Sequence, residues 1–112
     1  MNKFYVTKDV AEKLRAKGYY REYDVTDEWV EGIFYQVEDG TFHLPRIDEV
    51  LDWLREEKKI YLELVIVVDA EYMCDIYKID ASPIECLGST EYSKTYEAAA
   101  IAGIEYCLDN LI

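Results

Sequence analysis

The chain has 112 residues, of which 12 are Lys or Arg and 24 are Asp or Glu, so its formal net charge is −12 at pH 7. Hydrophobic residues make up 51% of it, which is too high a share for a disordered acidic tail. The length suits one domain, no apolar run approaches the roughly 18 residues of a membrane span, and the first nine residues lack a signal-peptide core.

We therefore expect a small acidic cytoplasmic protein. Direct binding of nucleic acid is not expected, because a duplex-binding surface neutralises phosphates and this chain repels them. An anionic membrane surface would repel the chain for the same reason.

The first helix is predicted by a cap, an apolar face and a stop signal. The hydroxyl of Thr7 can accept a hydrogen bond from a backbone N–H of the first turn. Val10, Ala11 and Leu14 share one helical face. Gly18 stands where a left-handed residue is wanted at the end of the helix.

Residues 19–31 mix aromatic and acidic side chains without a clear period, so we expect a loop or an irregular segment there. Two short aromatic strands follow, over residues 33–37 and 41–44. The turn between them ends on Gly40, which accepts the positive φ of a tight hairpin. Such a hairpin is not stable alone and needs to pack on the rest of the protein.

A second helix is expected to open at Pro45, because a missing N–H costs nothing in the first turn. Acidic residues follow near its positive end and basic residues near its negative end. Its apolar stripe has the i, i+3, i+4, i+7 spacing of a buried helix face and consists of Ile47, Val50, Leu51 and Leu54, widened by Trp53.

The strongest strand signal runs over Ile60–Asp69. One face of this strand is apolar throughout and contains Ile60, Leu62, Leu64, Ile66 and Val68. The other face begins polar and becomes apolar, so we expect the far half to be buried on both sides or covered by the N-terminal segment. Two more strands follow, over Tyr72–Asp80 and over residues 84–88 with an extension toward Tyr92.

The last helix is capped by Thr95, and small residues fill its first half as far as Gly103. Small side chains allow a helix to approach a sheet closely, which we take as their role. A phosphate at the helix N-terminus is the alternative, against which Glu97 would compete. The expected inner stripe of this helix is Tyr96, Ala100, Gly103, Ile104, Cys107, Leu108 and Leu111.

These elements predict an α+β fold in the form of a two-layer sandwich. Residues 45–112 form a body of helix, three antiparallel strands and helix, in which both helices cover one face of the sheet. Residues 1–44 form a subdomain of one helix and an aromatic β-hairpin. We expect the two parts to make one compact unit.

Few residues offer catalytic, cofactor-binding or metal-binding chemistry. The one histidine, His43, lies in an aromatic strand and has no partners for a triad or a metal site in view. No serine stands in a nucleophile elbow, and no glycine cluster could hold a phosphate. The three cysteines, Cys74, Cys86 and Cys107, lack zinc spacing, and we interpret them as small buried residues of a protein in a reducing compartment.

Carboxylate pairs are unavoidable in so acidic a chain. Asp48, Asp52 and Glu56 share a helix face at intervals of four residues, where two carboxylates could bind a divalent cation or act as an acid/base pair. Such spacing costs a helix only tenths of a kcal/mol, so a plain solvated face explains it equally well. Asp69, Glu71 and Asp75 lie near the main hairpin without the glycine and the spacing of a calcium loop. We assign no catalytic residue, cofactor or metal, and no small-molecule substrate is implied.

The unusual feature of the composition is its 11 tyrosines. Tyrosine is rigid, amphipathic and common at contact surfaces, and aromatic residues concentrate in the first 42 positions. Either they pack the hairpin onto the body, or part of that surface binds a partner. The candidate partner-contact residues are Tyr19, Tyr20, Tyr23, Trp29, Phe34, Tyr35 and Phe42.

Two stretches carry a resemblance to a family. They are residues 45–57 (PRIDEVLDWLREE) followed by residues 60–63 (IYLE), and residues 95–99 (TYEAA) followed by residues 103–108 (GIEYCL). The chain resembles small uncharacterised proteins encoded in phages, prophages and conjugative elements of gut bacteria. The matching motifs are structural, and the family has no assigned activity to carry over.

The order of helix, three strands and helix is also similar to the double-stranded-RNA-binding topology. In that topology the last helix presents lysines to phosphate. Here the first turns of the last helix have only Lys94 nearby, opposed by Glu97. The resemblance therefore implies the topology without the RNA-binding function.

Three functions remain in view. The first is a non-enzymatic accessory protein of a phage or mobile element that acts through protein–protein contact, with a protein partner or by self-association. The second is an acidic mimic of nucleic acid that inhibits a DNA-binding host defence protein, which requires carboxylates at phosphate-like spacing. The third is a small enzyme that uses paired carboxylates. We favour the first, and do not expect an enzyme.

Overall fold

The computed structural model describes residues 5–19, 25–26, 34–37 and 40–112. The fold is α+β, as predicted, and its described elements are three helices and two three-stranded antiparallel sheets. The elements are α1 (Lys8–Ala16), β1 (Val25–Thr26), β2 (Phe34–Val37), β3 (Gly40–His43), α2 (Ile47–Glu57), β4 (Ile60–Val67), the short 3₁₀ turn η2 (Val68–Ala70), β5 (Glu71–Lys78), β6 (Glu85–Ser89) and α3 (Tyr96–Asn110).

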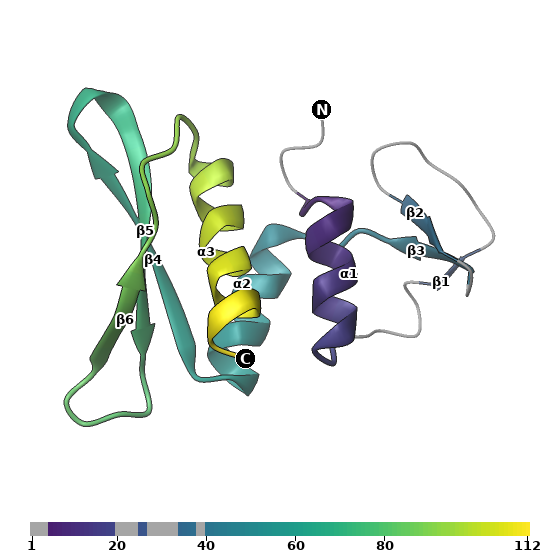
Figure 1. The fold of residues 1–112 in the computed structure, drawn as a ribbon, viewed down its shortest axis with the longest axis horizontal. Coiled ribbons are helices and arrows are strands. Elements are labelled where there is room, and N and C mark those ends of the chain that lie inside the picture. The colour runs from purple at the N-terminus through teal and green to yellow at the C-terminus, as the bar shows by residue number, and fades with distance from the viewer. Residues whose placement is uncertain (1–4, 20–24, 27–33, 38–39) are drawn as a thin grey trace.

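The larger sheet has the strand order β4-β5-β6 and is covered on one face by α2 and α3 (Figure 1). The predicted order of helix, three antiparallel strands and helix is therefore present. Helix α1 packs against α3 on the side away from this sheet, and the small sheet β1-β3-β2 lies beyond α1 (Figure 1). The molecule is flat and elongated, with extents of 45 × 33 × 18 Å.

Helix α1 forms as its sequence predicts. The Thr7 hydroxyl accepts a hydrogen bond from the N–H of Val10 at 3.3 Å. Val10, Ala11 and Leu14 are all fully buried. Gly18 has a φ of +98°, a conformation that a residue with a side chain rarely adopts.

The small sheet corrects one prediction. Residues 19–31 were expected to be irregular, but Val25–Thr26 forms β1 and pairs with β3, with Val25 opposite Phe42. Two residues are too few to show a period, so the sequence gives no signal of this strand. The expected hairpin partner is present, since β2 pairs with β3 from Phe34 opposite His43 to Val37 opposite Gly40. Of the predicted turn, residues 38 and 39 lie outside the described residues, and Gly40 is the first residue of β3.

The start of α2 also differs from the prediction. The helix begins at Ile47 with Arg46 as its cap, so Pro45 precedes the helix instead of opening it. The carbonyl of Pro45 accepts a hydrogen bond from the N–H of Val6 at 3.0 Å, and Tyr5 forms a bridge with Arg46. This long-range pairing holds residues 45–46 extended and delays the helix by two residues.

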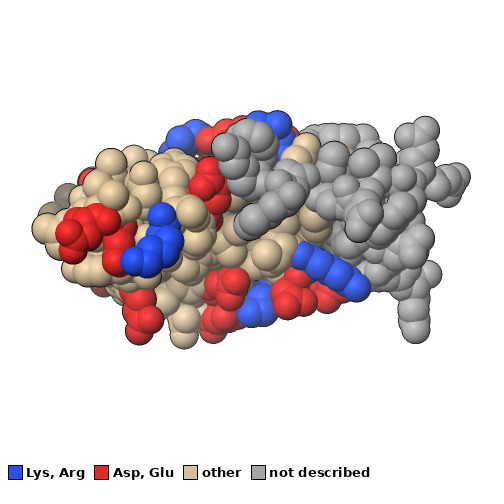
Figure 2. Space-filling model, turned by 90° about the horizontal axis from the view of Figure 1, so that it is seen from above, with Lys and Arg blue, Asp and Glu red and all other residues tan. Residues whose placement is uncertain are grey.

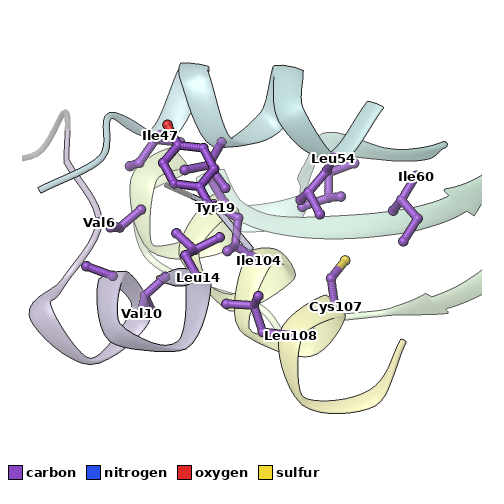
Figure 3. Packing of buried hydrophobic residues seen from close by; sticks show 14 of the residues in the cluster. Val6, Val10, Leu14, Tyr19, Ile47, Leu54, Ile60, Ile104, Cys107 and Leu108 are labelled. Atoms are coloured by element: carbon purple, nitrogen blue, oxygen red, sulfur yellow. The ribbon is translucent and has the colours of Figure 1, made fainter. Parts of the chain in front are cut away.

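One hydrophobic cluster joins the first 44 residues to the rest of the chain. Side chains from α1, α2, α3 and the first half of β4 point toward one another between the helices (Figure 3). The labelled members of this cluster are Val6, Val10, Leu14, Tyr19, Ile47, Leu54, Ile60, Ile104, Cys107 and Leu108. A core shared in this way holds both parts in a fixed relation.

Gly103 sets the distance between α3 and the sheet. A Cβ atom at this position would lie 2.6 Å from the Cys74 sulfur and 2.8 Å from a methyl carbon of Leu62. Both distances are far below van der Waals contact, and both neighbouring side chains are buried. The predicted role of the small residues, a close approach of the helix to the sheet, is therefore observed at Gly103.

Replacing Gly103 with alanine is expected to lower the free energy of unfolding by about 1–2 kcal/mol. Overpacking costs about 1–3 kcal/mol, and the better helix propensity of alanine offsets up to about 1 kcal/mol of it. Chemical denaturation with far-UV circular dichroism measures this change.

The Cys74→Ala variant supplies the control, since it removes the sulfur that the new methyl group would strike. In that background the Gly103→Ala substitution should cost less, with the Leu62 contact remaining, and a double-mutant cycle measures the difference. An equal cost in both backgrounds would show that the close contact with Cys74 is not the cause.

Candidate interaction surface

The aromatic residues predicted to contact a partner do not form one exposed surface. Tyr19 is only 6% exposed and packs its ring edge-on against Trp53, with centroids 5.4 Å apart. Phe42 is 4% exposed and lies under the guanidinium of Arg15, 3.7 Å from the ring centroid. These two are core residues in the structure and not contact residues. Both meet helical side chains distant in sequence, which local pattern does not reveal.

The other five predicted contact residues cannot be placed on a surface. Phe34 and Tyr35 lie in β2, where the backbone register sets Tyr35 opposite Phe42, but their side chains are outside the described residues. Tyr20, Tyr23 and Trp29 lie outside the described residues altogether.

His43 has a structural setting. Its Nδ1 atom is 2.6 Å from the carbonyl oxygen of Leu44, to which the ring N–H donates. The ring also packs against Tyr5, with centroids 5.3 Å apart and an angle of 54° between the planes. The imidazole is therefore held by the Leu44 carbonyl and the Tyr5 ring.

Three carboxylates of α2, those of Asp48, Asp52 and Glu56, form ion pairs with arginines. Asp48 accepts a hydrogen bond from Arg46 at 3.0 Å, and this contact lowers the pKa of the Asp48 carboxyl. Arg55 bridges Asp52 at 3.0 Å and Glu56 at 3.4 Å. The row of acids on this helix is thus part of a mixed, solvated ionic surface.

Two of the acids near the main hairpin, Glu71 and Asp75, also have polar partners. Glu71 pairs with Lys94 at 2.9 Å, and Asp75 accepts a hydrogen bond from the Ser89 hydroxyl at 2.6 Å. Within the part of the chain that the structure describes, no group of three or more His, Cys, Asp or Glu side chains is arranged to hold a metal ion.

An open hollow of about 610 Å³ lies between α1 and α3. Its walls carry the carboxylates of Asp9, Glu12 and Glu105 together with the ammonium of Lys13. Lys13 reaches across to Asp109 on α3 at 3.0 Å, and the hydrogen bond raises the pKa of this lysine. The hollow is wide and lined by charged side chains, and its one lysine, Lys13, already pairs with Asp109.

The three cysteines are free, and only Cys86 is exposed. Cys74 and Cys107 are buried on the helix side of the sheet, and burial raises the pKa of each thiol to about 12. The predicted burial is therefore correct for two of the three.

The most distinctive surface lies at the end of the β4–β5 hairpin. Ile66 and Tyr72 are directly opposite each other in the sheet, and the ring of Tyr72 meets that of Tyr96 edge-on at 6.3 Å. Ile66 is 69% exposed, Val68 79% and Tyr96 49%. We call these residues, together with Tyr72, the hairpin-end surface, defined as Ile66, Val68, Tyr72 and Tyr96.

Uncharged atoms cover much of this end of the molecule, with a few acidic and basic side chains among them (Figure 2). Large apolar side chains gathered in this way on a small protein mark interaction sites more often than scattered ones do. The surface is also held firmly, since Tyr72 and Ser93 exchange two backbone hydrogen bonds of 2.8 and 2.7 Å. The Glu71–Lys94 ion pair ties the same two segments together.

This surface corrects three sequence predictions. Ile66 and Val68 were expected to face the core, the far half of the strand to be covered, and Tyr96 to lie on the inner stripe of its helix. Instead α2 and α3 leave the hairpin end bare (Figure 1). The 11 residues of α2 span about 17 Å, whereas the eight of β4 span about 27 Å, so the helix cannot cover the strand. Comparing these lengths was the signal that could have revealed the exposed half.

The turn that carries this surface has an unusual backbone. Val67 pairs with Glu71, so three residues, Val68–Ala70, make the connection. Asp69 and Ala70 have φ values of +64° and +57°, in the left-handed region. Aspartate tolerates this region, whereas an alanine in it destabilises the folded state by about 1–2 kcal/mol.

No described helix is long and apolar enough to cross a membrane. Comparison with known proteins adds no relative, since no protein-family model, curated protein or solved structure matches the chain.

The Ala70→Gly variant is expected to raise the free energy of unfolding by about 0.5–1 kcal/mol. Glycine removes the left-handed strain, and its greater freedom in the unfolded chain takes back part of the gain. Ala102→Gly, in the middle of α3, is the matched control and should lower the free energy of unfolding by about 0.5–1 kcal/mol. Thermal and urea denaturation measure both, and a loss of stability in Ala70→Gly would contradict the assigned turn.

Native protein at about pH 8 should react with a thiol reagent at Cys86 alone, because the thiolate is the reactive form. The raised pKa values of Cys74 and Cys107 keep their thiols protonated until about pH 12. Between pH 9 and 12 the unfolded chain loses these protons and the native state keeps them, so the free energy of unfolding should fall as pH rises. Titration with a chromogenic disulfide, with and without denaturant, counts the reactive thiols; three fast thiols in native protein would contradict the burial.

Proposed function

We propose that this protein is a non-enzymatic accessory protein that acts by binding protein through the hairpin-end surface. The observation that carries the proposal is the exposure of two aliphatic side chains and one tyrosine, Ile66, Val68 and Tyr96, at one end of the sheet. Tyrosine is enriched in protein interfaces, and an aliphatic residue beside it supplies apolar area to bury. The rigid strands beneath limit the ordering cost of binding.

The setting we propose is the cytoplasm of a cell that carries a phage or mobile element. Its support is the resemblance of residues 45–57 and 95–108 to small proteins of such elements. The three free cysteines are in keeping with a reducing compartment.

The acidic mimic of nucleic acid receives less support than protein binding. Such a mimic needs carboxylates repeated without compensating bases. Among the described residues, basic side chains pair with acids on several elements, at Lys13–Asp109, Arg46–Asp48, Arg55–Asp52, Lys78–Asp80 and Lys94–Glu71. The carboxylate-based enzyme also receives less support, because Arg46 and Arg55 pair with Asp48, Asp52 and Glu56, the acids that it would use.

Affinity capture with paired variants tests the proposal. Ile66→Asp places a charge in the hairpin-end surface, and Ile84→Asp places one on a similarly exposed isoleucine, 61% exposed, at the opposite end of the sheet. Loss of a central apolar contact costs about 2 kcal/mol, so Ile66→Asp should reduce capture of a bound protein about 30-fold. Ile84→Asp should capture it as the original protein does.

Both variants need to keep the melting temperature of the original protein within a few degrees, because Ile66 and Ile84 are largely exposed. If Ile66→Asp captures the same proteins in the same amounts as the original, the hairpin-end surface is not the binding site and the proposal fails.

A further inference from the structure

Strand β4 is an edge of the larger sheet. In the order β4-β5-β6, one side of β4 pairs with β5 over all eight residues. Among the described residues no strand pairs with its other side. An open strand edge offers a row of backbone donors and acceptors to another chain.

The hydrogen bonds of the sheet tell which residues of β4 point their backbone toward this open side. The N–H of Ile79 donates to the carbonyl of Lys59 at 3.0 Å, so Lys59 faces β5. The backbone of Cys74, opposite Leu64, is engaged on the β6 side, where its carbonyl accepts from Thr90 at 2.8 Å. Because bonded pairs alternate in an antiparallel ladder, the residues whose N–H and C=O face the open side are Ile60, Leu62, Leu64 and Ile66.

This edge lacks the features that usually prevent pairing. Strand β4 contains no proline, glycine, lysine or arginine, and Glu63 is its one charged residue. The opposite edge is different, since β6 has five residues and its pairing with β5 is interrupted between Ile76 and Tyr77. Short strands and irregularities protect edges, whereas a long regular apolar edge invites a partner.

The two halves of β4 complement each other. On its helix-facing side Ile60 and Leu62 are buried, with 2% and 7% exposure, beneath the helices. On the same side Ile66 is 69% exposed, and Val68 just beyond it is 79% exposed. A two-fold axis through the middle of the strand would set the covered half of one copy beside the bare half of the other.

We propose that the protein forms a symmetric dimer in which β4 pairs antiparallel with β4 of a second copy, centred on Leu64. This names the partner of the hairpin-end surface and so rests on the proposed function. The pairing joins two three-stranded sheets into one of six strands, with Ile66 opposite Leu62 and Val68 level with Ile60. The neighbouring register, centred on Glu63, sets two glutamates directly opposite each other and is disfavoured.

Charge gives this dimer a recognisable salt dependence. Each copy carries a net charge of −12, so the copies repel each other at long range. Added salt screens that repulsion and leaves the backbone and apolar contacts of β4 in place. The dimer should therefore tighten as salt rises, whereas a basic partner on the same surface would bind more weakly.

Sedimentation equilibrium of the purified full chain tests the proposal. The expected result is a reversible dimer of twice the chain mass of 13.2 kDa, with a dissociation constant in the micromolar range, falling as salt is added. Two lysine variants discriminate the site, since each adds one positive charge to β4. Ile66→Lys puts it on the open helix-facing side opposite Leu62, and should weaken the dimer about 100-fold.

Val65→Lys is the matched control on the other face of the strand, where Val65 is opposite Glu63 of the second copy in the proposed register. It should keep the dimer or tighten it a few-fold through two new Glu–Lys pairs. Circular dichroism melting of each variant checks that the monomer still folds.

A chain that stays monomeric up to about 1 mM overturns the dimer. So does equal weakening by the two lysine variants, or a dimer that dissociates as salt rises. The proposed function is judged separately: monomeric protein that captures another protein through Ile66 keeps that function and refutes the dimer, and capture unaffected by Ile66→Asp refutes the function.

Discussion

The approach of α3 to the larger sheet is the contact on which the structure depends. At Gly103 a single added carbon would collide with Cys74 and Leu62, so the helix backbone lies almost on the side chains of the sheet. This closeness lets Ile104, Cys107 and Leu108 reach into the core that α1 and α2 share. Protein interiors are close-packed, so a helix held further from the sheet would leave voids along the whole interface between them.

The same contact fixes what is left uncovered. Helix α3 begins at Tyr96, and the segment before it is tied to β5 through Tyr72 and Ser93. The helix therefore cannot be shifted along the strands to cover Ile66 without breaking either the Gly103 contact or this backbone pairing. The exposed end of the hairpin thus follows from how the core is closed, and no local choice of residue at positions 66 or 68 could bury it.

The sequence predicted well the features whose causes are local. The caps Thr7 and Thr95 act as expected, with hydrogen bonds of 3.3 and 3.1 Å to the first turns of α1 and α3. Alternation predicted β4, the segment after its turn was predicted as the partner strand β5, and the small residues as far as Gly103 predicted a close helix–sheet contact. The likeness to the double-stranded-RNA-binding topology and to phage proteins stays a prediction.

What the sequence missed was decided by tertiary geometry. Pro45 could open a helix locally, but its carbonyl accepts a hydrogen bond from Val6, about 40 residues earlier. Tyr19 and Phe42 are residue types common at contact surfaces, but both are buried, because Trp53 packs against Tyr19 and Arg15 packs against Phe42. Ile66 lies on the face of β4 that alternation predicts to be buried, but its side chain is exposed. Periodicity tells which side chains share a face, but the reach of the covering element decides whether that face is buried.

High net charge and an apolar strand edge are compatible in this molecule because they occupy different places. Most acids of the described residues lie on the helices and turns, where several pair with Lys13, Arg46 or Arg55. Strand β4 is almost free of charge, and its open edge and its bare apolar half lie on one eight-residue segment. Repulsion between copies is spread over the surface and acts against every orientation alike, whereas the attraction is concentrated in one strand. An arrangement of that kind suppresses indiscriminate association and leaves pairing along β4 as the contact in which backbone hydrogen bonds and apolar burial are gained together.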